Sequence, residues 1–326
     1  MTPSEGQPDW RPTASPDLLQ ARARLNHTLR AFFAARSILE VETPLLSHAI
    51  GSDPNLHPIT AFYQAHPHAV AETLYLQTSP EFAMKRLLAA GSGPIYQLCK
   101  ALRNGEEGSK HNPEFTMLEW YRPGFTLVQL MDEVEALVGA ALGAQSCQRL
   151  TYREVFLRYV AVDPHTATLA ELATLVQRTI NLHKAEADRD TLLELLYSHV
   201  IEPALVEPVF IFDYPASQAA LARISTDTKG QQVAQRFELV IKGMEIANGY
   251  DELVDANEQQ RRFGVDQAQR RARGLPAYPI DERLLAALAP GLPPCAGVAM
   301  GVDRLLMLLT GARTIAEVLA FPHPDA

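Results

Sequence analysis

Hydrophobic residues recur at helical spacing in several parts of the chain. One helical face carries Leu18, Leu25, Leu29, Phe32 and Phe33. Ser15 followed by Pro16 is a typical helix start, so the pattern predicts a helix ending near Arg36. The same spacing predicts further helices at residues 82–90, 126–143, 169–177 and 191–205. A highly charged stretch at residues 255–274 is predicted to form a helix with a solvated face.

Apolar runs separated by turn residues predict strands in the rest of the chain. The run Ile95–Leu102 and the apolar residues from Phe115 to Trp120 flank a loop that contains Gly105 and Gly108, which is the pattern of a hairpin. Further strands are predicted at residues 209–214, at 297–301 before a helix, and within 235–250.

The extended run Leu39–Leu46 is predicted to be one strand. Pro44 lies inside it and has no backbone N–H to donate. We therefore expect this strand at a sheet edge or at an interface.

Composition limits the class of protein. A chain of 326 residues with 47% hydrophobic content can form one large core or two modest domains. Its net charge of -9 provides no broad basic field, which argues against tRNA as a partner. Cys99, Cys147 and Cys295 form no Cys-x-x-Cys pair, so neither a zinc site nor a disulfide framework is indicated. No apolar run approaches the roughly 18 residues that span a bilayer, and no export signal is present. We therefore expect a cytoplasmic protein and no membrane partner.

The predicted hairpin carries side chains suited to a nucleotide. The guanidinium of Arg103, at the end of the first strand, can bind a phosphate through paired hydrogen bonds. The ring of Phe115, on the returning strand, can stack on a nucleobase. The alternative is an ordinary charged hairpin.

Glu238 and Glu245 are candidate metal ligands. They would project from opposite faces of one straight strand, because side chains alternate. If the chain turns at residues 241–243, the two residues become cross-strand partners and their carboxylates converge. Two such carboxylates suit a Mg²⁺ ion shared with a triphosphate, whereas the alternative is two solvated charges.

Four segments in this order resemble the signature motifs of class II aminoacyl-tRNA synthetases, specifically the lysyl branch. They are RSILEVETPLL, HNPEF, QRFELVIKGMEIANGYDEL and GVAMGVDRLLMLL, and the resemblance spans residues 16–322. It implies an α+β fold: an antiparallel sheet flanked by helices, with a helical insertion at about 151–205. The expected organisation is a flexible segment at 1–15 and one catalytic domain at 16–326. The family's first motif forms a dimer contact, so a homodimer is also implied.

The resemblance implies an ATP and Mg²⁺ site that activates a carboxylate as an acyl-adenylate. Arg103 and Arg304 would be catalytic, holding the α-phosphate and the γ-phosphate. Phe115 would stack on adenine, and Glu238 with Glu245 would bind Mg²⁺. The remaining nucleotide contacts implied are Asn104, Gly105, His111, Asn112, Ile246 and Gly301.

The amino-acid site implied by the resemblance is acidic. Glu119, Tyr121 and Glu252 would hold the amino groups of lysine or an isomer, with Glu81 beside them. Ser79, Pro80, Asn248 and Ala299 would complete it. Ser79 and Glu81 are alternatively plain helix caps, and Ala299 plain strand packing.

The acceptor is inferred from what precedes the first motif. Lysyl-tRNA synthetases carry an anticodon-binding barrel there, whereas about twenty residues precede the first helix here. The chain therefore resembles stand-alone members of the lysyl branch, which transfer (R)-β-lysine to a lysine of translation elongation factor P. Ala299 and Ser79 stand where tRNA enzymes usually have glycine and alanine, and a methyl group in a pocket separates near-isomers by roughly 1 to 3 kcal/mol. A lysyl-tRNA synthetase-like enzyme that uses α-lysine and a non-catalytic amino-acid-binding module are the alternatives.

Two positions depart from the family pattern. Gly105 stands where the second motif usually has glutamate, with Glu106 one place later, and Ser37 stands where glycine is usual.

Overall fold

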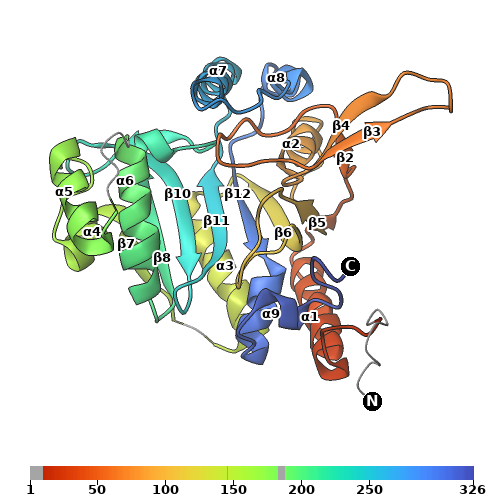
Figure 1. The fold of residues 1–326 in the computed structure, drawn as a ribbon, viewed down its shortest axis with the longest axis horizontal. Coiled ribbons are helices and arrows are strands. Elements are labelled where there is room, and N and C mark those ends of the chain that lie inside the picture. The colour runs from red at the N-terminus through yellow and green to blue at the C-terminus, as the bar shows by residue number, and fades with distance from the viewer. Residues whose placement is uncertain (1–9, 145, 183–187) are drawn as a thin grey trace.

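The computed structural model describes residues 10–144, 146–182 and 188–326. In this part of the chain, a large sheet is flanked by helices and a small second sheet projects to one side (Figure 1). The strands are β1 (Leu39–Glu40), β2 (Leu46–Ser47), β3 (Thr60–Tyr63), β4 (Glu72–Leu76), β5 (Ile95–Leu102), β6 (Glu114–Pro123), β7 (Gln148–Thr151), β8 (Val209–Pro215), β9 (Ile224–Thr226), β10 (Gln232–Val240), β11 (Glu245–Asp251) and β12 (Cys295–Gly301).

The large sheet is mostly antiparallel. Its strand order is β1-β5-β6-β12-β11-β10-β8-β7, and β9 pairs with β10. Only the outer pairs β1–β5 and β7–β8 of this order are parallel among the described residues. The predicted α+β class, with an antiparallel sheet flanked by helices, is confirmed.

Helices of the N- and C-terminal regions cover one face of the sheet. Leu25, Leu29 and Phe33 of α1 pack in one core with Leu118 and Trp120 of β6. Residues of α3 and α9 belong to the same core. The helices are α1 (Pro16–Ala34), α2 (Glu81–Ala89), α3 (Leu127–Leu142), α4 (Tyr152–Val160), α5 (Leu169–Ile180), α6 (Arg189–Leu196), α7 (Ala256–Ala272), α8 (Glu282–Leu288), α9 (Val302–Thr310) and α10 (Ile315–Val318).

The predicted start of α1 is confirmed, because the Ser15 hydroxyl accepts a hydrogen bond from Leu18 N at 3.3 Å. The single strand predicted over Leu39–Leu46 is wrong. Two short strands lie there instead: β1 pairs with β5 in the large sheet and β2 with β4 in the small one. Pro44 lies between them and cannot donate to a ladder. Ser37 just before β1 has a φ of 54°, a left-handed conformation that favours the glycine usual at this position.

The region 151–205 is helical and packs separately from the first core. Helices α4, α5 and α6 form a second core against β8, at the left of Figure 1. A π-helical turn (Tyr197–Ile201) and a 3₁₀ turn (Glu202–Ala204) complete the region, and a further 3₁₀ turn (Ala216–Gln218) follows β8. Residues 183–187 lie outside the described part.

Of the segment predicted as flexible, residues 1–9 lie outside the described part. Thr13 N and Ala14 N donate to Ala320 O and Leu319 O, at 2.8 and 3.2 Å. No helix in the described ranges is both long and apolar enough to cross a membrane.

The charged helix α7 is less solvated than predicted. Arg261 and Arg271 are exposed and the other charged side chains of the helix are partly buried, except Arg270, which is fully buried. Its guanidinium donates to Asp53 O at 2.8 Å and to Leu56 O at 3.1 Å. The helix therefore holds the loop at residues 51–57, which borders the cavity described next.

Candidate active site

A cavity of about 1190 Å³ lies over the large sheet. Successive side chains of β6 point to opposite faces of the sheet. Phe115, Glu119 and Tyr121 point to the cavity and form part of its floor, whereas Leu118 and Trp120 pack in the helix-covered core. The loop at residues 51–57 and helices α2, α6 and α7 contribute its walls. All the predicted site residues except Asn104 and Gly105 line this cavity.

Strand register brings distant residues into one row across the floor. Glu238 of β10 pairs with Asn248 of β11, Asn248 with Ala299 of β12, and Ala299 with Glu119 of β6. Directly paired residues share a face of the sheet. Two predicted amino-acid contacts and a predicted metal ligand therefore lie in line with Ala299.

The neighbouring row of the cavity floor requires a glycine at position 297. Gly297 lies between Tyr250 and Tyr121 in the register. A Cβ at Gly297 would lie 2.3 Å from Tyr121 Cε1 and 2.5 Å from Glu252 Oε1. Only glycine leaves room here for the phenol ring and the carboxylate.

Glu119 is a buried carboxylate that is in direct contact with no cation of the described part of the chain. Its side chain accepts a hydrogen bond from the Tyr121 hydroxyl at 2.6 Å on Oε1, and Oε2 has no hydrogen-bond partner among the described residues. Burial, and then the nearby charge of Glu81, raise the pKa of Glu119 to about 8. A ligand ammonium group would satisfy Oε2 and favour the ionised form.

Glu81 and Glu252 share a cation that the sequence analysis did not include. Lys85 Nζ lies 2.6 Å from Glu81 Oε1 and 2.6 Å from Glu252 Oε2. The Lys85 side chain is only 1% exposed. Both carboxylates were predicted to contact substrate, and each already has one oxygen on Lys85.

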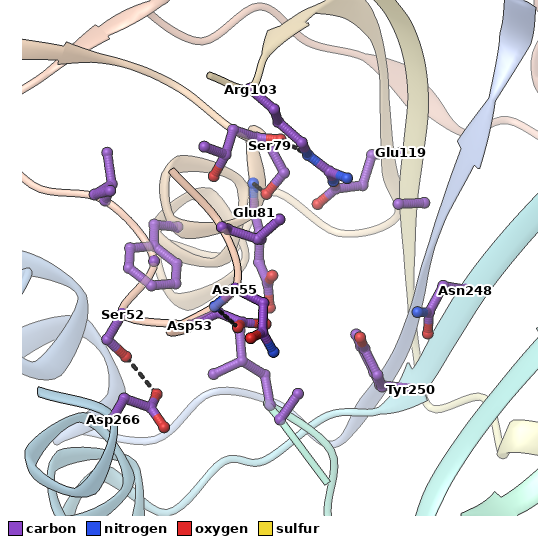
Figure 2. Close-up of a pocket in the computed structure, with 18 of the residues that line it drawn as sticks. Ser52, Asp53, Asn55, Ser79, Glu81, Arg103, Glu119, Asn248, Tyr250 and Asp266 are labelled. Carbon is purple, nitrogen blue, oxygen red and sulfur yellow. Dashed lines mark hydrogen bonds between the residues drawn. The ribbon is translucent and has the colours of Figure 1, made fainter. Parts of the chain in front are cut away.

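The remaining predicted amino-acid contacts surround this acidic end (Figure 2). Ser79 Oγ accepts a hydrogen bond from Glu81 N at 3.3 Å, so Ser79 also acts at the helix start, as the alternative interpretation proposed. Pro80 is the N-terminal cap residue of α2. Asn248 Oδ1 accepts a hydrogen bond from Arg236 Nε at 3.2 Å, which fixes the orientation of its amide.

The part of the cavity next to the end of β5 is basic and aromatic. The Arg103 guanidinium lies 5.1 Å from the centre of the Phe115 ring, and its Nε donates to Thr78 O at 3.3 Å. Glu106 Oε1 lies 3.5 Å from Arg103 Nη1. The shifted glutamate of the second motif therefore still reaches the arginine, while Gly105 adopts a φ of 81° in the turn.

Arg304 faces the same part of the cavity from the first turn of α9. It donates to Glu245 O at 2.8 Å, and its Nη2 lies 2.7 Å from His111 Nε2. Burial, and then the positive charge of Arg304, lower the pKa of His111, which favours the neutral ring. Gly301 is the N-terminal cap residue of α9. Both arginines keep part of their surface exposed, with side chains 25% and 20% accessible.

Two predicted nucleotide contacts, Asn112 and Asn104, have hydrogen-bond partners within the protein, a third lies in a turn, and a fourth is apolar. Asn112 Nδ2 donates to Glu114 O at 2.6 Å, and its Oδ1 accepts from His323 N at 3.0 Å. Asn104 N donates to His57 O at 2.8 Å. Gly105 supplies the turn described above, and Ile246 is a buried residue of β11.

The two candidate metal ligands lie on one hairpin, but they are not partners. The predicted turn is present, with Val240 opposite Glu245 across it, whereas Glu238 pairs with Asn248. The predicted direct pairing is wrong because Asn248, the partner of Glu238, lies three residues after Glu245, and the register shift after Leu239 brings Val240 opposite Glu245. Glu238 forms an ion pair with Arg236, and burial raises its pKa to about 7, with Glu245 contributing. No group of three or more His, Cys, Asp or Glu residues suited to a metal ion occurs in the described ranges.

Comparison with known proteins places the chain in a family. Residues 8–325 match the family model described as tRNA synthetases class II (D, K and N). The chain belongs to this family. A protein of Salmonella typhi named elongation factor P–(R)-β-lysine ligase is 50% identical over 316 residues, which cover 96% of this chain and 97% of the relative. Proteins of the same name from Salmonella paratyphi B and Salmonella schwarzengrund are 49% identical over the same shares.

Within this class II synthetase fold, sequence reasoning missed residues of the cavity lining that position other side chains or the loop beside them. Arg236 is one, since it orients both Glu238 and Asn248. The loop at residues 51–57 is another, with Ser52 Oγ donating to Asp266 Oδ2 at 2.6 Å (Figure 2). Arg236 lies one residue after the start of a predicted strand. Its partner Asn248 lies on the neighbouring strand, and the register that brings the two together cannot be read from one sequence.

Proposed function

We propose that this protein activates (R)-β-lysine with ATP as an aminoacyl-adenylate and transfers the aminoacyl group to a lysine side chain of translation elongation factor P. In the first step a carboxylate oxygen bonds to the α-phosphorus of ATP, and pyrophosphate leaves. In the second step the acceptor amine bonds to the acyl carbon, AMP leaves, and the amine loses a proton. The function assigned is that of a ligase.

The observation that carries the proposal is that one cavity holds both cationic and anionic groups. Arg103 follows the end of β5 and Arg304 lies in the first turn of α9, whereas Glu119 lies buried in the middle of β6. Activation of a diamino acid by a nucleotide polyphosphate needs both kinds of group in a single space. The names of relatives that match nearly the whole chain agree with this substrate.

The nucleotide end contributes positioning and charge. The partly exposed guanidinium groups of Arg103 and Arg304 would neutralise phosphate oxygens as charge moves onto pyrophosphate. Phe115 offers its ring to the adenine. Magnesium, when bound with the nucleotide, would add further neutralisation at the phosphates. Glu238 and Glu245 suit it because Mg²⁺ usually takes one or two carboxylates, with phosphates and water as its other ligands.

The acidic end contributes recognition. Glu119 Oε2 has no hydrogen-bond partner among the described residues, and Tyr121 holds the carboxylate from the other oxygen. A buried carboxylate without a partner is costly, so an ammonium group bound there gains a strong charge-assisted hydrogen bond. The Ala299 methyl lies in the same row and narrows the floor beside Glu119. The methyl group would favour β-lysine, in which one amino group is on the β-carbon, over α-lysine.

We propose a homodimer as the working form, acting in the cytoplasm without a tRNA or membrane partner. The segment around β1 and β2 supports a dimer, because Leu39, Leu45 and Leu46 are 56%, 43% and 44% exposed at the sheet edge. Light scattering after size exclusion tests the dimer: a mass near 72 kDa is expected from a chain of 36.0 kDa, and a mass near 36 kDa would refute it. We also propose that residues 16–326 act as a single catalytic domain that includes the helical region.

The deciding experiment is amino-acid-dependent exchange of labelled pyrophosphate into ATP, comparing (R)-β-lysine with α-lysine. A mass spectrum of the acceptor follows, with elongation factor P or tRNA added. Preference for β-lysine and a mass gain on the factor are expected. Exchange with α-lysine and charging of tRNA alone would replace the proposal with a tRNA enzyme. Binding of an amino acid without exchange would leave a non-catalytic module.

A further inference from the structure

Lys85 is a buried cation on the wall of the amino-acid end. It lies on the inner face of α2, among the buried residues Met84 and Leu88. Its ammonium lies 2.6 Å from one oxygen of Glu81 and 2.6 Å from one oxygen of Glu252. A lysine is almost never fully buried unless it is paired, so the two carboxylates account for its position.

Counting charges gives Lys85 a further role. Glu81, Glu119 and Glu252 carry three negative charges when ionised, and Lys85 carries one positive charge. Two ammonium groups of a bound diamino acid would make the filled pocket neutral. Without Lys85 the filled pocket would keep one buried negative charge, which is unfavourable in a site shielded from water.

We infer that Lys85 is a positioning residue that sets the charge of the amino-acid pocket so that a substrate with two ammonium groups neutralises it. The inference rests on the proposed function, because it uses a diamino acid as the substrate. Lys85 also leaves one oxygen on each of Glu81 and Glu252 for other contacts. Lys85 thus fixes both the charge and the orientation of these carboxylates.

Other titratable groups surround this cluster, and among the described residues Lys85 is the cation with a main influence on the pKa of Glu119 and of Glu252. The phenol of Tyr121 touches Glu119, and Cys295 and Asp251 act on Glu252. The groups facing the cluster from the packed elements are Glu81 of α2, Cys99 of β5, Glu119 and Tyr121 of β6, Tyr250 and Asp251 of β11, Glu252 after it, and Cys295 of β12. Removal of Lys85 is therefore expected to make protonation of these carboxylates easier.

The test replaces Lys85 with a neutral residue of similar length, Lys85→Met. Calorimetry measures binding of (R)-β-lysine and α-lysine from pH 6 to pH 9, and pyrophosphate exchange measures the KM values. At pH 7 we expect at least a tenfold weaker binding of the preferred amino acid and an ATP KM within twofold of the unaltered protein. The pH below which binding weakens should rise by about one unit or more, because an adjacent cation lowers a carboxylate pKa by roughly 1 to 3 units.

Two further variants separate charge from packing. Lys85→Met with Glu81→Gln restores a neutral filled pocket, so part of the lost affinity should return and the pH limit should move back. Leu88→Ala makes a gap on the same helix without changing charge, so it should lower the melting temperature and leave the pH limit in place.

Three results would overturn the inference. A loss of affinity in Lys85→Met that is constant with pH, or a double variant no better than the single one, would show that Lys85 only supports the fold. In both cases the unaltered protein still binds a diamino acid and the proposed function stands. Failure of the unaltered protein to bind any diamino acid would refute both.

Discussion

Glu119 allows a direct test of the buried acidic end, through the stability of the free protein. The ordinary pKa of a glutamate is 4.5, and in the folded protein the pKa of Glu119 is raised to about 8. Burial is the largest cause of this rise. Between these values the folded state holds a proton that the unfolded state has released. Stability must therefore fall as pH rises through this window, since each pH unit changes the free energy of unfolding by about 1.4 kcal/mol per proton.

The change Glu119→Gln keeps the size of the side chain and removes the titration. From pH 5.5 to pH 7.5, the Glu119 contribution falls by about 2 to 3 kcal/mol, allowing for partial ionisation near pH 8. Urea unfolding at both pH values measures the difference, and subtracting the variant from the unaltered protein removes the titrations that Glu119 does not influence. The free energy of unfolding of the variant, relative to that of the unaltered protein, should therefore be higher at pH 7.5 than at pH 5.5 by about 2 to 3 kcal/mol.

The control is Glu207→Gln, because Glu207 is exposed. It should leave the pH dependence unchanged. The reasoning is refuted if Glu119→Gln shows the same fall in stability between the two pH values as the unaltered protein. Such a result would mean that Glu119 is ionised in the free protein, and that a ligand cation is not needed to charge it.

Three other changes test separate parts of the site. Arg304→Ala should lower kcat/KM for pyrophosphate exchange by about 10² to 10³, the usual loss for one charge-stabilising donor, and an unchanged rate would remove Arg304 from the nucleotide end. Gly297→Ala should abolish amino-acid binding and lower stability by about 1 to 3 kcal/mol, since the new methyl meets Tyr121 and Glu252; calorimetry and urea unfolding measure both. Arg270→Met should increase proteolysis in the loop at 51–57 and raise the amino-acid KM, because two carbonyls lose their donor; equal cleavage in both proteins would contradict this.

Local features of the fold could be predicted from the sequence. Ser15 and Pro16 mark the start of α1, and Gly105 lies in the turn between β5 and β6, because both signals act over a few residues. The run Leu39–Leu46 could not be assigned correctly. Its division between two sheets depends on β4 and β5, which lie farther along the chain.

The candidate site shows the same limit more clearly. The resemblance to a family placed Glu119, Asn248 and Ala299 together, whereas their row depends on register between strands up to 180 residues apart. Lys85 was missed for another reason. A lysine on an amphipathic helix ordinarily extends into solvent, and the tertiary packing of α2, which places Lys85 against Glu252, buries it here.

The arrangement of charge in the cavity also fixes the direction in which a diamino acid would bind. Positive groups, Arg103 and Arg304, lie beyond the end of β5 and at the start of α9, whereas Glu119 lies in the middle of β6. A carboxylate is repelled by the acidic floor and attracted to the arginines, while ammonium groups have the opposite preference. The substrate carboxylate must therefore point toward the nucleotide end, where it would be activated. A substrate bound the other way round would place a carboxylate against Glu119 and leave two ammonium groups beside the arginines.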